Sequence, residues 1–121
     1  MGREMLDTRG FTGTENWYRH WLVKDVLYTD GVKYVADQAG AYWLIDEIAF
    51  AQKITKVAKE EFQNWTLKVD KSSGVLTCTD GGKDAKKARI VFTKRISFTD
   101  FPDPEITLWY TDNVILLPSE Y

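Results

Sequence analysis

Hydrophobic residues along this chain follow two different spacings, and the change between them falls near residue 62. Before it, apolar side chains recur every three or four positions, which is typical of helices that bury one face. After it, apolar and polar residues alternate, which is typical of strands. The pattern therefore predicts a helical half followed by a strand-rich half.

The helical half contains two clear apolar faces. Asp30 is of a type that caps helices, and Gly40 suits the position after the last turn, where a positive φ costs glycine little. The first face consists of Val32, Val35, Ala36 and Ala39. The second consists of Ala41, Leu44, Ile45, Ile48 and Ala49. A further apolar series up to Phe62 continues the second helix or forms a third short one.

Alternation beyond residue 62 predicts four or five strands. Residues 65–69 and 75–79 flank a turn and form a hairpin. In the next strand, Lys94 interrupts a face formed by Ile90, Phe92, Ile96 and Phe98. A bulge or an edge position would accommodate that lysine. An alternating run at 106–110 and an apolar run at 114–117 complete the series.

These elements predict an α+β domain, with two or three N-terminal helices packed on one face of a four- to five-stranded antiparallel meander. Residues 1–10 are expected to be a flexible arm, and residues 11–121 a single globular domain. Within that domain, residues 21–28 are expected to add a short strand or extended piece.

Composition and charge narrow the function classes. Sixteen Lys and Arg against eighteen Asp and Glu give a net charge of −2, so no overall positive field attracts nucleic acid or anionic membranes. One cysteine and one histidine exclude a disulfide framework and a zinc site built from several such ligands. The chain shows neither an apolar run long enough to span a membrane nor a signal peptide, so we expect a cytoplasmic protein without a cofactor.

Four motifs carry a resemblance to a known family: WYRH at 17–20, LYTDG at 27–31, AGAYWLIDEIA at 39–49 and LPSEY at 117–121. In these motifs the chain resembles a family of small uncharacterised proteins, a domain of unknown function found in bacteria, phages and other mobile elements. The occurrence of the family in phages and mobile elements implies a role in the conflict between these elements and their hosts or in regulation, for example the inhibition of a host defence system.

Candidate catalytic groups are few. His20 could act as a general base if a carboxylate oriented its ring, and otherwise it fastens the N-terminal segment to the helices. The carboxylates in question are Asp30, Asp46 and Glu47. No phosphate-binding loop, dinucleotide motif, nucleophile elbow or zinc-protease motif is present, so we expect no enzyme and no metal site. Cys78 lies in a strand pattern and is expected to be a small buried hydrophobe.

Charge is unevenly distributed. Between residues 83 and 95 there are six bases against one acid. The bases are Lys83, Lys86, Lys87, Arg89, Lys94 and Arg95. Such a segment could contact nucleic-acid phosphates, or it could be a solvated loop with an edge strand that its charges protect from aggregation. The acidic remainder permits docking on a basic partner surface, or it serves as ordinary solubilising charge.

Aromatic residues make up 14% of the chain. The strand pattern places Phe62, Trp65, Phe92, Phe98 and Tyr110 in the sheet core. Six other aromatic residues do not fit the periodic core pattern: Trp17, Tyr18, Trp21, Tyr42, Trp43 and Trp109. If exposed, these would anchor a binding surface, and if buried they would form a second core. Trp109 in particular is expected at a surface contact, including the seam of a homodimer.

We therefore expect a non-enzymatic protein-binding module, an inhibitor such as an anti-CRISPR that covers a surface of a basic, nucleic-acid-binding host complex. The predicted contact residues are Trp17, Tyr18, Tyr42, Trp43, Asp46, Glu47 and Trp109. The alternatives are a nucleic-acid-binding accessory protein that uses residues 83–95, and a small enzyme that uses His20.

Overall fold

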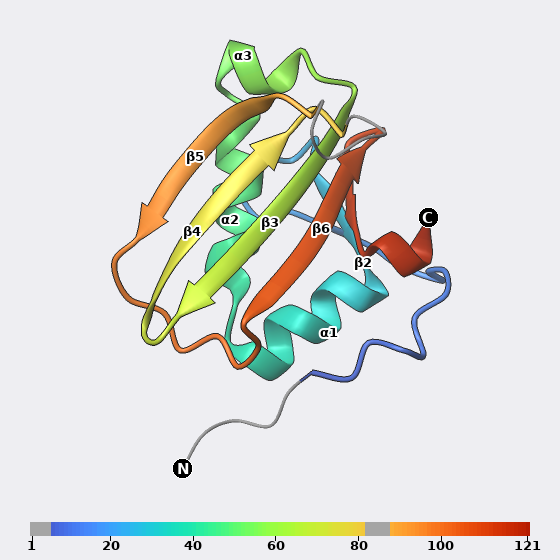
Figure 1. Cartoon of the computed structure of the whole chain (residues 1–121). Helices are drawn as coiled ribbons and strands as arrows, with labels where there is room; N and C mark the ends of the chain where they lie inside the picture. The colour runs from blue at the N-terminus through green and yellow to red at the C-terminus, as the bar shows by residue number, and fades with distance from the viewer. Residues whose placement is uncertain (1–5, 82–87) are drawn as a thin grey trace.

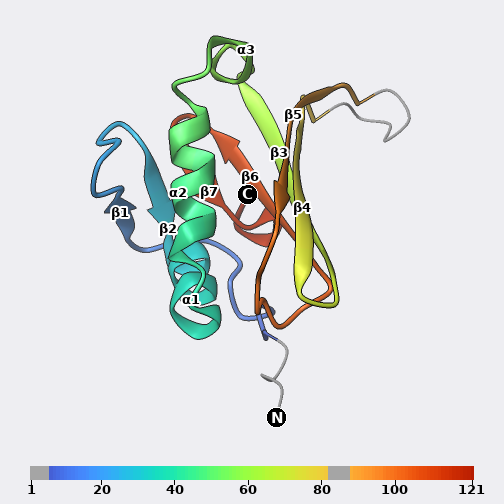
Figure 2. The same ribbon diagram turned by 90° about the vertical axis from the view of Figure 1, so that its left-hand side faces the viewer.

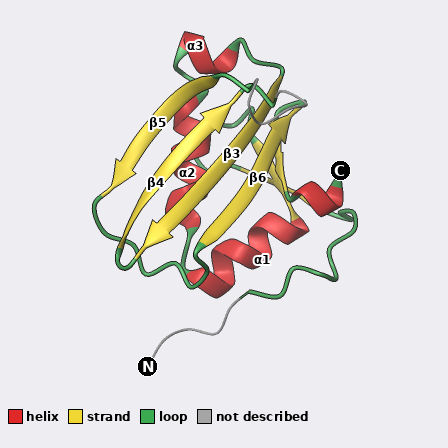
Figure 3. Ribbon diagram, in the orientation of Figure 1, coloured by secondary structure: helices red, strands yellow, loops and turns green. Residues whose placement is uncertain are grey.

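The computed structural model describes residues 6–81 and 88–121 (Figures 1 and 3). In chain order its elements are β1 (Trp17–Arg19), β2 (Leu27–Thr29), α1 (Asp30–Ala39), α2 (Tyr42–Ala51), α3 (Thr55–Ala58), β3 (Phe62–Asp70), β4 (Ser73–Thr79), β5 (Ile90–Ile96), β6 (Glu105–Thr111), β7 (Val114–Leu116) and the 3₁₀ helix η1 (Pro118–Glu120).

Within the described residues, all strands join one seven-stranded sheet in the order β1-β2-β7-β6-β3-β4-β5. Strands β2 and β7 run parallel, and the other neighbouring pairs run antiparallel. The α+β class is confirmed, but the expected four- to five-stranded antiparallel meander behind N-terminal helices is wrong. Two strands precede the helices, and each of them has only three residues, too few to show an alternating pattern.

The sheet curls around α2. In Figure 2, α2 lies between β1 and β2 on one side and β3, β4 and β5 on the other. The inner face of β3 buries Trp65 and Leu67 against the helices, while its alternate residues point to the outer face. On α2 the expected apolar face is buried, including Leu44, Ile45 and Ile48. The concave face of the sheet and α2 therefore share one hydrophobic core.

The core also contains a polar side chain, that of Gln63. Gln63 is fully buried on β3, and its amide exchanges two hydrogen bonds with the amide of Gln52, at 2.8 and 2.9 Å. The Gln63 amide also donates to the Val57 carbonyl oxygen at 2.9 Å and accepts from the Trp65 indole at 2.9 Å. Because its polar atoms are satisfied, Gln63 fixes the end of α2 and α3 against the sheet at little energetic cost.

The predicted first helix is confirmed, but its N-cap lies one residue earlier than expected. Helix α1 spans Asp30–Ala39, and Gly40 follows it with a φ of 61°. The N-cap is Thr29 rather than Asp30, because the Thr29 hydroxyl accepts from the backbone N–H of Val32. This leaves the Asp30 carboxylate free to bind the segment that precedes β1.

Strand β5 is the sheet edge, as the interrupting Lys94 predicted, and it carries a bulge opposite β4. The bulge reverses the side-chain alternation, because Phe92 lies opposite Cys78 whereas Ile90 lies opposite the next residue of β4. Ile90 therefore faces outward and is 60% exposed, and Phe98, beyond the end of β5, is 72% exposed. The prediction that Ile90 and Phe98 belong to the core is wrong.

The N-terminal arm is partly attached. Residues 1–5 lie outside the described residues. Leu6 packs against the core, and its backbone N–H donates to the carboxylate of Asp103 at 3.1 Å. The described part of the expected arm thus runs along the domain.

Candidate functional site

His20, just beyond β1, is 2% exposed and lies against α2. Its Nδ1 accepts hydrogen bonds from the backbone N–H groups of Leu22 and Val23, at 3.2 and 2.9 Å. The ring proton therefore resides on Nε2, which donates to Asp46 Oδ1 at 2.7 Å. His20 thus fastens the N-terminal segment to α2, and its basic lone pair is already engaged.

Two aromatic side chains flank the histidine on the surface. Trp21 is 67% exposed, its ring centroid lies 5.8 Å from that of His20, and its indole N–H donates to Asp46 Oδ1 at 3.1 Å. Phe50, 41% exposed, meets the His20 ring edge-on at 5.5 Å. Trp21 and Phe50 are therefore held near one another although they are far apart in the sequence.

Tyr42 extends this cluster along α2. It is 42% exposed, and it stands four residues before Asp46 and eight before Phe50, so that the three side chains share one helix face. The Tyr42 hydroxyl donates to the carboxylate of Asp37, and this bond raises the pKa of Tyr42 to about 12. We call Trp21, Tyr42 and Phe50 the aromatic surface.

A hollow of about 330 Å³ opens beside the aromatic surface. It is lined by Arg19, His20, Trp21, Tyr28, Tyr42, Ile45 and Asp46. Strands β1 and β2 supply one wall and α2 supplies the other, so the hollow exists only because the sheet curls around the helix.

Glu47, the neighbour of Asp46, serves the opposite end of the sheet. Its carboxylate accepts two hydrogen bonds from Lys94 Nζ on β5, at 2.7 and 2.9 Å. Adjacent residues on a helix point about 100° apart, which explains how two consecutive carboxylates reach two different sheet edges. Asp46 belongs to the aromatic surface, and Glu47 does not.

The remaining predicted contact residues are dispersed. Trp17, on β1, is 57% exposed, and Tyr18 donates its hydroxyl hydrogen bond to Asp30 at 2.9 Å. Trp43 is half-buried and packs against the core. Trp109 is half-buried on the outer face of the sheet. The structure thus brings Tyr42 and Asp46 together but leaves these four residues outside their cluster.

The outer face of the sheet has its own aromatic cluster around Trp109. The Phe62 ring lies 5.1 Å and the Tyr121 ring 5.5 Å from that of Trp109, both edge-on. Phe62 is therefore half-buried on the outer face, and its predicted place in the sheet core is wrong. Trp109 is therefore packed between two other rings and is not fully exposed.

Sequence reasoning omitted Trp21 and Phe50 from the predicted contact residues. Trp21 follows a buried residue with no periodic signal of its own, and only the fold places it against Asp46. A signal for Phe50 did exist, because Tyr42, Asp46 and Phe50 recur at intervals of four residues on α2.

The comparison with protein families agrees with the expected resemblance. A model of a family of unknown function, DUF6876, matches residues 5–121. The chain belongs to DUF6876. No curated protein and no solved structure matches it. The expectation of an uncharacterised domain family is therefore confirmed, and membership of DUF6876 assigns no activity.

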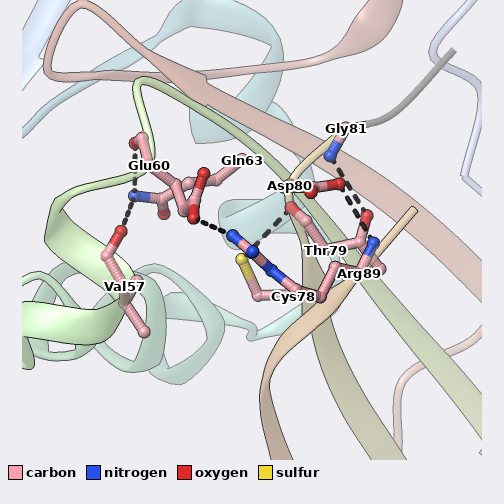
Figure 4. A network of polar contacts seen from close by, with 8 residues as sticks. All are labelled: Val57, Glu60, Gln63, Cys78, Thr79, Asp80, Gly81 and Arg89. Carbon is pink, nitrogen blue, oxygen red and sulfur yellow. Dashed lines mark hydrogen bonds and ion pairs between the residues drawn. The ribbon is translucent and has the colours of Figure 1, made fainter. Parts of the chain in front are cut away.

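The basic segment of this DUF6876 domain lies partly outside the described residues, since Lys83, Lys86 and Lys87 fall there. Of the described bases, Arg89 donates to the Glu60 carboxylate at 2.6 Å (Figure 4) and Lys94 is bound to Glu47. Arg95 is exposed on β5. Two of the bases expected to contact phosphates are therefore held by carboxylates.

Backbone contacts of Arg89 reinforce that arrangement. Its N–H donates to the Asp80 carboxylate and its carbonyl oxygen accepts from the Asp80 N–H, each at 3.1 Å (Figure 4). These bonds join the two described ends of the β4–β5 connection. Arg89 thus stabilises the structure where the basic segment joins β5.

Cys78 is fully buried on β4 beside this network. Burial, with smaller contributions from the Glu60 and Asp80 carboxylates, raises the pKa of its thiol to about 12. A thiol with so high a pKa is protonated at neutral pH and is a poor nucleophile. The prediction of a small buried hydrophobe is confirmed.

Residues 6–81 and 88–121 contain no group of three or more His, Cys, Asp or Glu side chains that could hold a metal ion. Over the same ranges, no helix has both the length and the apolar character needed to cross a membrane.

Proposed function

We propose that this DUF6876 domain is a non-enzymatic protein-binding module and that the aromatic surface is its contact face. The observation that carries the proposal is the exposure of three large rings on one face, around the buried His20 and its partly exposed partner Asp46. Full burial of one such side chain is worth roughly 1.5–3 kcal/mol. Trp and Tyr are also the residues most enriched among the strongest contacts of protein interfaces.

Rigidity favours binding through this surface. Trp21 is fixed by its indole hydrogen bond to Asp46, and Phe50 by its edge contact with His20. Side chains that are already ordered lose less conformational entropy when a partner covers them. The aromatic surface is therefore preorganised for binding.

The state of His20 supports binding rather than catalysis. A general base needs a lone pair within reach of the substrate proton. In His20, Nδ1 accepts two backbone N–H groups and Nε2 donates to Asp46. Its engagement with backbone and carboxylate suits a structural support for the aromatic surface.

Inhibition of a host defence complex in the cytoplasm, as by an anti-CRISPR, is the specific role that we propose for such a module. It would act by covering a basic, nucleic-acid-binding surface. The support is the family resemblance together with the acidic balance of the chain, 18 acids against 16 bases. Expression of the chain in cells with active interference against a plasmid should restore plasmid maintenance, and unchanged interference across the systems tested would contradict this role.

The binding proposal is tested with a double variant and a matched control. Tagged wild-type chain, Trp21→Ala/Phe50→Ala and Trp17→Ala are used to capture partners from host cells, and the dissociation constant of the captured protein is measured by calorimetry. Trp17 is also an exposed tryptophan but lies outside the aromatic surface. We expect the double variant to bind at least about tenfold more weakly, because two contact rings are lost.

Wild-type affinity should persist in Trp17→Ala. Equal affinity of the double variant and the wild type would show that the aromatic surface is not the contact face. Circular dichroism of each variant separates lost contact from lost folding, and all three substituted side chains are exposed enough for the variants to fold.

A further inference from the structure

We infer that the 330 Å³ hollow beside the aromatic surface receives an arginine side chain of the protein partner. This inference rests on the proposed function and names the chemistry of the partner group. It is carried by three aromatic rings and one carboxylate that line the same hollow.

The aromatic walls come from three separate segments. Trp21 follows β1, Tyr28 lies on β2 and Tyr42 begins α2. Tyr28 is held in place by stacking on Tyr18, with 5.6 Å between the ring centroids. A cation within about 6 Å of such rings is attracted by their negative faces, and the attraction strengthens as water is excluded.

Asp46 supplies the negative charge of the hollow. The hydrogen bonds that it accepts from His20 Nε2 and from the Trp21 indole both end on Oδ1. Within the described part of the chain no hydrogen bond ends on Oδ2, and the side chain is 32% exposed. His20 is neutral in this arrangement, since Nδ1 accepts and only Nε2 donates. The negative charge of Asp46 is therefore not cancelled by its buried partner.

Three further charged groups, Arg19, Lys33 and Asp37, lie in or near the hollow. Arg19 contributes to its lining, but the Arg19 guanidinium donates to the carbonyl oxygen of Lys24, which anchors its charge in the β1–β2 connection. Asp37 accepts from Tyr42 and from Lys33. Burial raises the pKa of Tyr28 most, the Lys33 charge lowers it, and Asp37 and Asp46 raise it, so that charges of both signs act on this wall.

Arginine fits the donor and acceptor pattern better than other cations do. Its planar guanidinium stacks on an aromatic face while its N–H groups donate to a carboxylate, whereas an ammonium group is more strongly hydrated and cannot stack. A phosphate or carboxylate ligand would be repelled by Asp46. The hollow is therefore suited to a side chain from the basic partner surface that the charge pattern permits.

The test uses a blocked peptide, acetyl-Gly-Arg-Gly-amide, and its lysine and citrulline counterparts. Citrulline keeps the shape of arginine but carries no charge. The indole N–H resonance of Trp21, assigned with Trp21→Phe, reports binding during titration to about 20 mM, because a single side chain binds in the millimolar range. We expect a saturable shift with the arginine peptide, at least fivefold weaker binding of the lysine peptide and no saturable shift with citrulline.

Two neighbouring carboxylates provide matched variants. Asp46→Asn keeps an Oδ1 acceptor for His20 and Trp21 while removing the charge, and it should weaken arginine binding at least tenfold. Glu47→Gln removes the next carboxylate, which is bound to Lys94 outside the hollow, and should leave arginine binding unchanged. Tyr42→Leu, at an exposed position, gives a second variant with weakened binding if Asp46→Asn does not fold.

Equal shifts with arginine and citrulline, or equal effects of Asp46→Asn and Glu47→Gln, would overturn the arginine site. Partner capture distinguishes this result from failure of the proposed function. If the partner still depends on Trp21 and Phe50 while the arginine peptide does not bind, only the arginine site is wrong. If the arginine peptide binds but partner capture does not depend on those rings, the proposed contact face is wrong.

Discussion

Asp30 shows how one carboxylate organises a segment that has little regular structure. It accepts hydrogen bonds from the backbone N–H groups of Glu15 and Asn16 and from the Tyr18 hydroxyl, at 3.0, 3.2 and 2.9 Å. These bonds, that of Glu15 first, lower the pKa of Asp30 from 3.8 to about 2. A residue expected to cap a helix instead holds the approach to β1.

A pH dependence follows from that lowered pKa. Because the folded state holds the Asp30 proton less tightly than the unfolded state, the stabilisation is present above about pH 4 and is lost as the pH falls through about 2. We expect the stability difference between wild type and Asp30→Asn to shrink over that window, as measured by urea unfolding at several pH values.

The comparison with Asp30→Asn is needed because the Arg9 contacts also lower the pKa of Asp7 to about 2. Asp25→Asn, at an exposed position in the β1–β2 connection, is the control and should leave the profile unchanged. A difference between wild type and Asp30→Asn that stays constant from pH 5 to about pH 2 would contradict the role of this carboxylate.

At the scale of elements, the C-terminal turn completes the start of α1. Glu120, on η1, accepts from the Thr29 hydroxyl at 2.6 Å and from the backbone N–H of Gly31 at 3.1 Å. It also accepts from the backbone N–H of Leu117 at 2.9 Å. The carboxylate therefore satisfies the backbone N–H of Gly31, which has no partner within the helix, at a terminus where the helix dipole favours a negative charge.

Gly31 allows this close approach. A Cβ at position 31 would lie 2.6 Å from Leu117 Cδ1 and 2.7 Å from a Glu120 carboxylate oxygen. The motifs LYTDG and LPSEY, at opposite ends of the chain, thus meet at one helix terminus. This contact gives a structural reason for residue types that the sequence motifs contain.

Removal of the capping carboxylate should destabilise the fold. We expect Glu120→Ala to lower the free energy of unfolding by about 1–2 kcal/mol, because charge-assisted bonds to a helix N-terminus are lost. Ser119→Ala, next to it and exposed, should change little. Urea denaturation monitored by tryptophan fluorescence measures both, and equal stability of the two variants would contradict the capping role.

Over the whole molecule, α2 is clasped by both ends of the curled sheet. Asp46 holds His20 beyond β1 at one end, and Glu47 holds Lys94 on β5 at the other. The two clasps differ in burial, because His20 is buried whereas the Lys94 side chain is 47% exposed. They should therefore contribute unequally to stability.

We expect His20→Ala to lower the free energy of unfolding by about 3 kcal/mol, because it opens a cavity and leaves buried polar groups unpaired. Lys94→Met should cost only about 0.2–1 kcal/mol, and this cost should shrink as salt is added. Chemical denaturation at low and high salt checks both values. Equal costs, or a strong salt dependence for His20→Ala alone, would contradict this division between the clasps.

Local physics explains which features the sequence predicted. The two helices, the β3–β4 hairpin and the edge character of β5 follow from spacing, capping residues and one misplaced lysine. Cys78 was predicted as buried because its strand neighbours alternate. Strands β1 and β2 were not predicted as a pair, because they join the rest of the sheet only through the pairing of β2 with β7, which lies at the far end of the chain.

The candidate site depends on such long-range contacts. Tyr42 and Asp46 could be selected from the sequence, since both lie on α2 and depart from its buried face. Trp21 could not be joined to them, because only the antiparallel pairing of β1 with β2 carries it to α2. Likewise, Asp46 and Glu47 look alike as neighbours, and only the position of each sheet edge gives them different partners.

By itself, the sequence determined the local elements and the α+β class, and it indicated that Cys78 is buried. It also showed many aromatic residues whose positions in the fold it left open. Only the tertiary structure decided which rings meet at a surface and which carboxylate lies beside them. The physical reason is that helix and turn preferences act over a few residues. The parallel β2–β7 pairing, the curl of the sheet around α2 and the His20–Asp46 contact instead depend on segments brought together by the burial of one shared core.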